Sequence, residues 1–118
     1  MRYWSFPERK PDTDKGDYGR VFILAGSTGL TGAAYLASQA AILSGSGLVT
    51  LGIPRGLNSI MARKLTEVMT KPLPQTRAQT LSRKAFSEIR EFSRQADVVA
   101  IGPGLSRNRE TQALIRRV

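Results

Sequence analysis

A glycine-rich turn between an apolar segment and an alanine-rich segment constrains the fold of this chain more than any other feature. The turn reads Ala25-Gly26-Ser27-Thr28-Gly29-Leu30-Thr31-Gly32-Ala33-Ala34. The unbroken apolar run before it is typical of a strand buried on both faces of a parallel sheet. Residues 31–44 after it predict a buried helix, with Thr31 as the N-cap and Gly45 as the C-cap. A strand, a turn and a helix in this order indicate an α/β fold.

The same turn has the composition of a ligand cradle. Glycines let a backbone approach a ligand closely, and a helix N-terminus offers unpaired N–H groups and a partial positive charge. The spacing of Gly26, Gly29 and Gly32 is G-x-x-G-x-x-G, which is neither the dinucleotide fingerprint nor the phosphate loop of nucleoside triphosphatases. A tight turn that merely packs helix on sheet explains the pattern equally well, so the pattern leaves both interpretations open.

The rest of the chain alternates strands and helices. Residues 1–19 form a polar leader, and residues 20–118 predict βα units of a three-layer α/β/α domain with a mostly parallel sheet. The expected strands are 20–26, 48–53 and 97–102, with a further short strand over 67–72. The expected helices are 31–44, 56–65, 81–95 and a last helix from Asn108 onwards.

Composition excludes several classes of site. The chain has no cysteine and no histidine, which rules out disulfides, thiol nucleophiles, Cys/His zinc sites and Ser-His-Asp catalysis within it. The net charge is +9, but the basic residues are scattered and lack an aromatic stacking platform, which disfavours nucleic-acid binding. No apolar run approaches the length of a membrane span and no signal peptide is evident, so we expect a cytoplasmic protein without a membrane partner.

Five motifs in order resemble the amino-terminal part of an NAD(P)H-hydrate dehydratase, a nucleotide-dependent repair enzyme of the ribokinase-like superfamily. The resemblance covers roughly residues 15–118, with Ala25 and Ser46 as small departures from the family pattern. The motifs are Lys15-Gly16-Asp17-Tyr18-Gly19-Arg20-Val21, the Gly26 to Ala34 turn, Ala40-Ala41-Ile42-Leu43-Ser44-Gly45-Ser46-Gly47-Leu48-Val49-Thr50, Thr66-Glu67-Val68-Met69 and Ala96-Asp97-Val98-Val99-Ala100-Ile101-Gly102-Pro103-Gly104-Leu105.

The resemblance implies an activity on damaged cofactors. The family converts NADHX or NADPHX, which carry water across a ring double bond, back to NAD(P)H. ADP or ATP, with Mg²⁺, phosphorylates the added hydroxyl, and phosphate then leaves. The catalytic and metal-binding motifs of the family lie beyond the matched part, so the chain is expected to be the first portion of a single domain. We expect the 118-residue chain alone to be inactive and to associate with the rest of that domain, in a homo-oligomer.

Carried over by position, the resemblance assigns a substrate-binding wall. Ala33 or Ala34 would touch the hydrated cofactor together with Gly104, and Gly32 and Gly102 would shape the wall. Valine at Gly32 or Gly104 is therefore expected to weaken ligand binding much more than folding.

Three further residues are candidates for the same site, namely Lys15, Gly26 and Ser27. Asp97 stands directly before a predicted strand. We interpret it as a hydrogen-bonding residue at the strand end rather than as a catalytic base.

Two other functional classes remain open at this stage. A ribokinase-like kinase for a small alcohol, such as a vitamin precursor or a sugar, would share the predicted sheet. A non-catalytic binding or assembly module would be consistent with the absence of the family's catalytic motifs.

Overall fold

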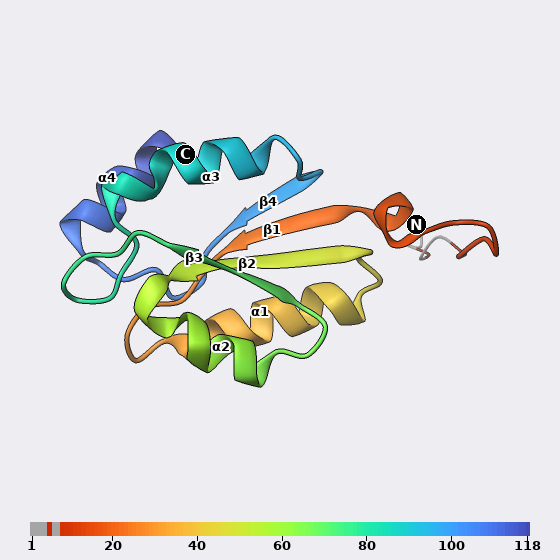
Figure 1. Cartoon of the computed structure of the whole chain (residues 1–118), viewed down its shortest axis with the longest axis horizontal. Coiled ribbons are helices and arrows are strands. Elements are labelled where there is room, and N and C mark those ends of the chain that lie inside the picture. The colour runs from red at the N-terminus through yellow and green to blue at the C-terminus, as the bar shows by residue number, and fades with distance from the viewer. Residues whose placement is uncertain (1–4, 6–7) are drawn as a thin grey trace.

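The computed structural model describes Ser5 and residues 8–118. Four strands and four α-helices alternate along this part of the chain, with short 3₁₀ turns between some of them (Figure 1). In chain order they are η1 (Lys15–Tyr18), β1 (Arg20–Leu24), α1 (Thr31–Leu43), β2 (Leu48–Pro54), η2 (Arg55–Leu57), α2 (Asn58–Lys64), β3 (Met69–Leu73), η3 (Arg83–Ala85), α3 (Phe86–Ser93), β4 (Val98–Ile101) and α4 (Arg109–Arg117).

The four strands form one parallel sheet in the order β3-β2-β1-β4. Arg20 of β1 is opposite Leu48 of β2, and Val21 is opposite Val98 of β4. Both neighbours of β1 run parallel to it, and β3 runs parallel to β2. The parallel arrangement predicted from the apolar runs is therefore confirmed, because strands with two buried faces need a helical layer on each side.

The sheet lies between two helical layers, with α1 and α2 on one face and α3 and α4 on the other (Figure 1). Successive side chains of β1 point to opposite faces, so Phe22 and Leu24 pack in one core and Ile23 packs in the other. Met61 of α2 is fully buried in the Ile23 core, and Ile89 of α3 is fully buried in the Phe22 core. The predicted three-layer α/β/α architecture is thus confirmed.

Helix α1 begins at Thr31 as predicted and ends at Leu43, one residue before the predicted end, and each of its caps lies one residue before the predicted one. Leu30, not Thr31, occupies the N-cap position, because the Leu30 N–H already bonds to the Ser27 carbonyl at 2.9 Å and Thr31 is the first helical residue. The C-cap is Ser44, and Gly45 follows it with φ +101°. The N–H of Gly45 bonds to the Ile42 carbonyl at 3.1 Å, which is the usual role of a glycine just beyond a helix end.

The third helix begins later than predicted, at Phe86 after the short 3₁₀ turn η3. The preceding segment is engaged elsewhere, since Gln75 and Leu81 form an antiparallel bridge and the Ser82 N–H bonds to the Pro74 carbonyl at 3.0 Å. Strand β2 also runs one residue further than predicted and includes Pro54. Within the described residues, no helix has the length and apolar character needed to cross a membrane.

Candidate functional site

Two glycine-containing turns meet at the carboxyl ends of the central strands. The first is the turn between β1 and α1, and the second is the Gly102–Gly104 segment after β4. The Gly26 N–H donates to the Pro103 carbonyl at 3.0 Å, and the Ser27 hydroxyl donates to the Gly104 carbonyl at 2.8 Å. Ligands of open α/β sheets collect at this edge, so the structure places the predicted wall where a ligand is expected.

The two turns also touch through Gly104 and the start of α1. A Cβ atom added at Gly104 would lie 3.0 Å from the Ala33 Cβ and 3.2 Å from the Leu30 Cβ and carbonyl oxygen. Gly104 also has φ +74°, a conformation that side chains other than glycine rarely adopt. Valine at Gly104 should therefore weaken folding substantially as well as ligand binding, because both the space and the backbone conformation require glycine.

Gly32 and Gly102 have open surroundings. No heavy atom lies within 4 Å of a Cβ built at either residue, so neither glycine is needed to avoid a clash within the chain. Gly32 is in the first turn of α1, which has no side-chain cap bond and no acidic residue. The first backbone N–H groups of α1 are therefore free of a competing carboxylate, which suits an anionic ligand such as a phosphate.

Ala33 and Ala34 have different environments. Ala34 is fully buried, and its Cβ lies 3.0 Å from the position of a Cβ added at Gly26. Ala33 is partly exposed beside Gly104. Of the two alanines, only Ala33 presents its side chain at the edge where the turns meet.

Lys15 lies at the opposite end of the sheet from the glycine turns. A Cβ added at Gly47, directly before β2, would come within 1.5 Å of the Lys15 carbonyl oxygen. The strands separate these two edges by about 17 Å for five residues at roughly 3.3 Å each. The structure thus brings Gly26, Ser27, Ala33 and Gly104 together but not Lys15, because η1 precedes β1 and packs at the amino ends of the strands.

Asp97 also lies at the amino ends of the strands. The Arg20 N–H donates to the Asp97 carboxylate at 2.7 Å, and the Asp97 N–H donates to the Arg20 carbonyl at 2.8 Å. The backbone bond continues the β1–β4 pairing by one residue, and the Asp97 carboxylate satisfies the Arg20 N–H at the end of the strand. The interpretation of Asp97 as a hydrogen-bonding residue at the strand end is confirmed.

A third loop at the carboxyl edge was missed by the sequence analysis. Residues 74–82, between β3 and α3, contact the first glycine turn through Thr28, whose N–H donates to the Gln79 carbonyl at 3.3 Å. The Gly56 N–H, after β2, donates to the Gln75 side-chain oxygen at 2.7 Å. The position of this loop could have been predicted from the parallel strands, because the loops after β2 and β3 must then lie at the same edge as the glycine turns.

Glu110, in the first turn of α4, is a carboxyl group near these loops with a perturbed pKa. The Ser82 hydroxyl donates to its carboxylate at 2.6 Å and the Arg83 N–H donates at 3.1 Å. These bonds, the Ser82 bond first, lower the pKa of Glu110. Glu110 is thus held as a carboxylate that caps η3, which is a structural role.

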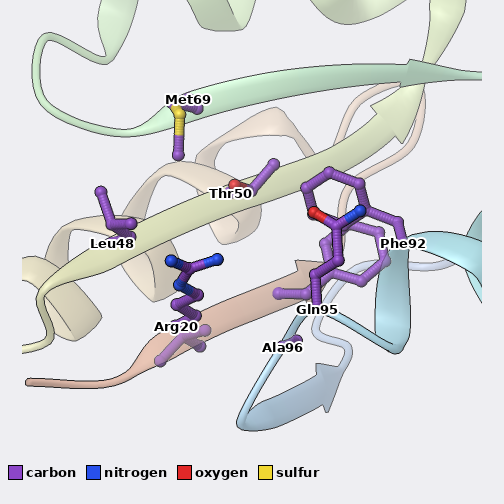
Figure 2. A pocket seen from close by; sticks show the side chains of 9 residues that line it. Arg20, Leu48, Thr50, Met69, Phe92, Gln95 and Ala96 are labelled. Carbon is purple, nitrogen blue, oxygen red and sulfur yellow. The ribbon is translucent and has the colours of Figure 1, made fainter. Parts of the chain in front are cut away.

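A cavity of about 90 Å³ lies on the α3 face of the sheet, away from the glycine turns. Figure 2 shows that its lining includes Arg20, Leu48 and Met69, the first residues of β1, β2 and β3. The cavity therefore belongs to the amino ends of the strands. It is separate from the edge at which the glycine turns meet.

Comparison with known proteins assigns the chain to a family. The family model described as NAD(P)H-hydrate dehydratase matches residues 21–118, from the second residue of β1 through α4. The chain belongs to the NAD(P)H-hydrate dehydratase family. This match confirms the resemblance drawn from the five motifs.

Individual relatives carry related names. The chain is 49% identical to a bifunctional NAD(P)H-hydrate repair enzyme of Moorella thermoacetica over 95% of the chain and 21% of that protein. It is 34% identical to an ADP-dependent (S)-NAD(P)H-hydrate dehydratase of Staphylococcus aureus over 86% of the chain and 33% of that protein. The chain thus spans between about a fifth and a third of the length of these relatives.

Solved structures agree on the fold. A ribokinase-like superfamily protein of Enterococcus faecalis superimposes with a TM-score of 0.72 at 27% identity, covering 94% of this chain and 36% of that one. A protein of Streptococcus mutans gives a TM-score of 0.75 at 28% identity, covering 92% of this chain and 36% of that one. The ribokinase-like fold class expected from the sequence is confirmed.

Proposed function

We propose that this chain forms part of the substrate-binding wall of an enzyme that dehydrates NADHX or NADPHX to NAD(P)H. The observation that carries the proposal is the contact between the two glycine turns at the carboxyl edge of the sheet. The two turns come from different βα units, yet the Gly26 N–H bonds to the Pro103 carbonyl and the Ser27 hydroxyl bonds to the Gly104 carbonyl. A Cβ atom built at Gly104 would lie 3.0 Å from the Ala33 Cβ. The family to which the chain belongs supplies the substrate class.

The wall has properties that suit a dinucleotide. The uncapped first turn of α1 presents backbone N–H groups and the positive end of the helix dipole to an anion such as a pyrophosphate. The open space around Gly32 and Gly102 leaves room for a ligand to approach the backbone closely. The wall would therefore bind and orient the hydrated cofactor. Gly32 and Gly102 would leave the cofactor space that a side chain would otherwise fill.

The phosphoryl donor in this proposal is ADP or ATP, since several relatives are named as ADP-dependent dehydratases. Phosphorylation converts the added hydroxyl into a good leaving group. The described residues, 5 and 8–118, contain no group of three or more Asp, Glu, His or Cys that could hold a metal ion. We therefore assign substrate binding to this chain and derive no step through the metal.

The proposal extends to the whole protein. The relatives are about three to five times longer than the segment that this chain matches, which supports a site completed by further chain. We propose that the complete protein is a cytoplasmic homo-oligomer. Analytical ultracentrifugation of the complete protein and fractionation of cells test these two points.

The decisive experiment measures NADH recovery from NADHX by absorbance, in the presence of ADP or ATP. It compares the 118-residue chain with a chimera in which the chain replaces the matching segment of the Moorella thermoacetica relative, to which it is 49% identical. The unaltered relative is the positive control. We expect turnover by the chimera and none by the chain alone, and a folded chimera without turnover would contradict the proposal.

The same assay separates the other functional classes. The comparisons support the dehydratase rather than a kinase for a small alcohol, because the family model and the named relatives are NAD(P)H-hydrate repair enzymes. A chimera that phosphorylates a small alcohol in preference to NADHX would reverse this conclusion. A chimera that binds NADHX without turning it over would favour a binding module.

A further inference from the structure

The segment between β3 and α3 forms a small hairpin at the carboxyl edge of the sheet. Gln75 and Leu81 pair as an antiparallel bridge, and the Thr76 N–H donates to the Thr80 carbonyl at 2.9 Å. The buried hydroxyl of Thr111, in α4, lies 2.8 Å from both the Thr80 hydroxyl and the Leu81 carbonyl. The base of the hairpin is therefore fixed to the helix that follows the Gly102–Gly104 turn.

The tip of the hairpin contacts Thr28 of the first glycine turn. Besides the backbone bond from the Thr28 N–H to Gln79, the Thr28 hydroxyl lies 3.0 Å from the Ala78 carbonyl and 3.1 Å from the Gln79 Oε1. Thr28 is exposed and occupies the turn between Gly26 and Gly29. The hairpin thus holds the turn from its solvent side.

The same glutamine reaches the turn after β2. A Cβ added at Gly56 would lie 2.5 Å from the Gln79 Nε2 and 2.9 Å from the Gln75 Oε1, so both glutamine side chains lie over the Gly56 backbone. The Gly56 N–H donates a hydrogen bond to the Gln75 Oε1. Gln79 is thus the side chain that spans from the glycine turn at Thr28 to the turn at Gly56.

The backbone of Gln79 is unusual for a residue with a long side chain. Its φ is +55°, in the left-handed region, and glycine is favoured at this position of a three-residue hairpin loop. A glutamine here does not serve the backbone geometry of the loop. Its side chain instead lies beside the Thr28 hydroxyl and over the backbone of Gly56, and a glycine at this position would lack both interactions.

We propose that Gln79 is a positioning residue for the substrate, which rests on the function proposed above. By holding Thr28, Gln79 fixes the glycine turn in the conformation that places Gly26, Ser27 and the start of α1 against Gly104. Gln79 acts through the turn, so its loss weakens substrate binding more than it slows the chemical step. The hairpin at residues 74–82 is then the third element of the wall.

The test uses Gln79→Gly in the chimera defined above. Glycine accepts the backbone conformation and keeps the backbone bond from Thr28, so this variant removes only the side chain and should unfold at the same urea concentration as the parent or a higher one. We expect KM for NADHX to rise about fivefold or more, as for the loss of a side-chain hydrogen bond, with kcat changed less than twofold. The control Gln112→Ala removes an exposed amide bonded to the Arg107 carbonyl and should leave both constants unchanged.

A second variant tests whether the effect runs through Thr28. Thr28→Val removes the hydroxyl and keeps the shape of the side chain, and it should raise KM to a similar extent. If both residues act through their mutual contact, the double variant should have the KM of the worse single variant rather than the product of the two effects. A KM within twofold of the parent in Gln79→Gly, a loss confined to kcat, or fully multiplicative effects would each overturn the proposal. A parent chimera without NADHX turnover would instead contradict the proposed function.

Discussion

Alanine substitution should destabilise the protein at one glycine of the wall, Gly104, but not at another, Gly32. At Gly104 the backbone has φ +74°, and a Cβ atom would lie 3.0 Å from the Ala33 Cβ and 3.2 Å from two atoms of Leu30. The left-handed backbone costs about 1–2 kcal/mol in a residue with a Cβ atom. Overpacking adds roughly 1–3 kcal/mol. We therefore expect Gly104→Ala to lower the free energy of unfolding by about 2–5 kcal/mol.

At Gly32 neither cost applies. The residue is in the first turn of α1, no heavy atom lies within 4 Å of the added Cβ, and φ is not in the left-handed region. Alanine is favoured over glycine within a helix by up to about 1 kcal/mol. Gly32→Ala should therefore leave the free energy of unfolding unchanged or raise it by up to roughly 1 kcal/mol. The two variants should differ by about 2 kcal/mol or more, in the order set by their surroundings.

The measurement is urea-induced unfolding of both variants in the chimera, followed by steady-state kinetics with NADHX. Gly32→Ala should have an unfolding midpoint at or above that of the parent, together with a higher KM, because its methyl group occupies the space into which the ligand is proposed to fit. If Gly32→Ala destabilises the protein as much as Gly104→Ala does, the packing argument is refuted. If it is stable and its KM is unchanged, Gly32 does not face the substrate.

Three further predictions concern the scaffold around the wall. The hydrogen bonds that lower the pKa of Glu110 should stabilise the folded protein at pH values above 4.5, the ordinary pKa of this group. This contribution should be lost as the pH falls through the lower pKa of the folded state. The stability of Glu110→Gln to urea should therefore depend less on acid pH than that of the parent. Asp97→Ala removes the 2.7 Å bond from Arg20 and should cost about 1 kcal/mol in urea unfolding, while an unchanged kcat would exclude Asp97 as a base. Gly47→Ala would place a Cβ 1.5 Å from the Lys15 carbonyl oxygen and should displace η1. Limited proteolysis should then cleave the chain faster before Arg20, and unchanged cleavage would contradict this packing.

The local βα units and the family could be predicted from the amino-acid sequence. The apolar runs before the glycine turns predicted parallel strands with two buried faces, and the structure pairs β1 with β2 and β4 in that way. These features could be predicted because strand burial and helix formation depend on neighbouring residues. The five motifs added the family, which a match over residues 21–118 confirms.

The contacts made by the loops at the carboxyl edge could be read only from the three-dimensional structure. Residues 81–85 fit the helical pattern of the segment, yet the hairpin at residues 74–82 is held by bonds to Thr28, which is 50 residues from Ala78 in sequence. Lys15 is close to the glycine turn in sequence, yet the length of β1 separates them. The family resemblance places Gly104 beside Ala33 or Ala34, and the structure selects Ala33. Contacts between remote segments depend on the order of the strands and on the paths of the loops, which the local pattern of residues does not encode.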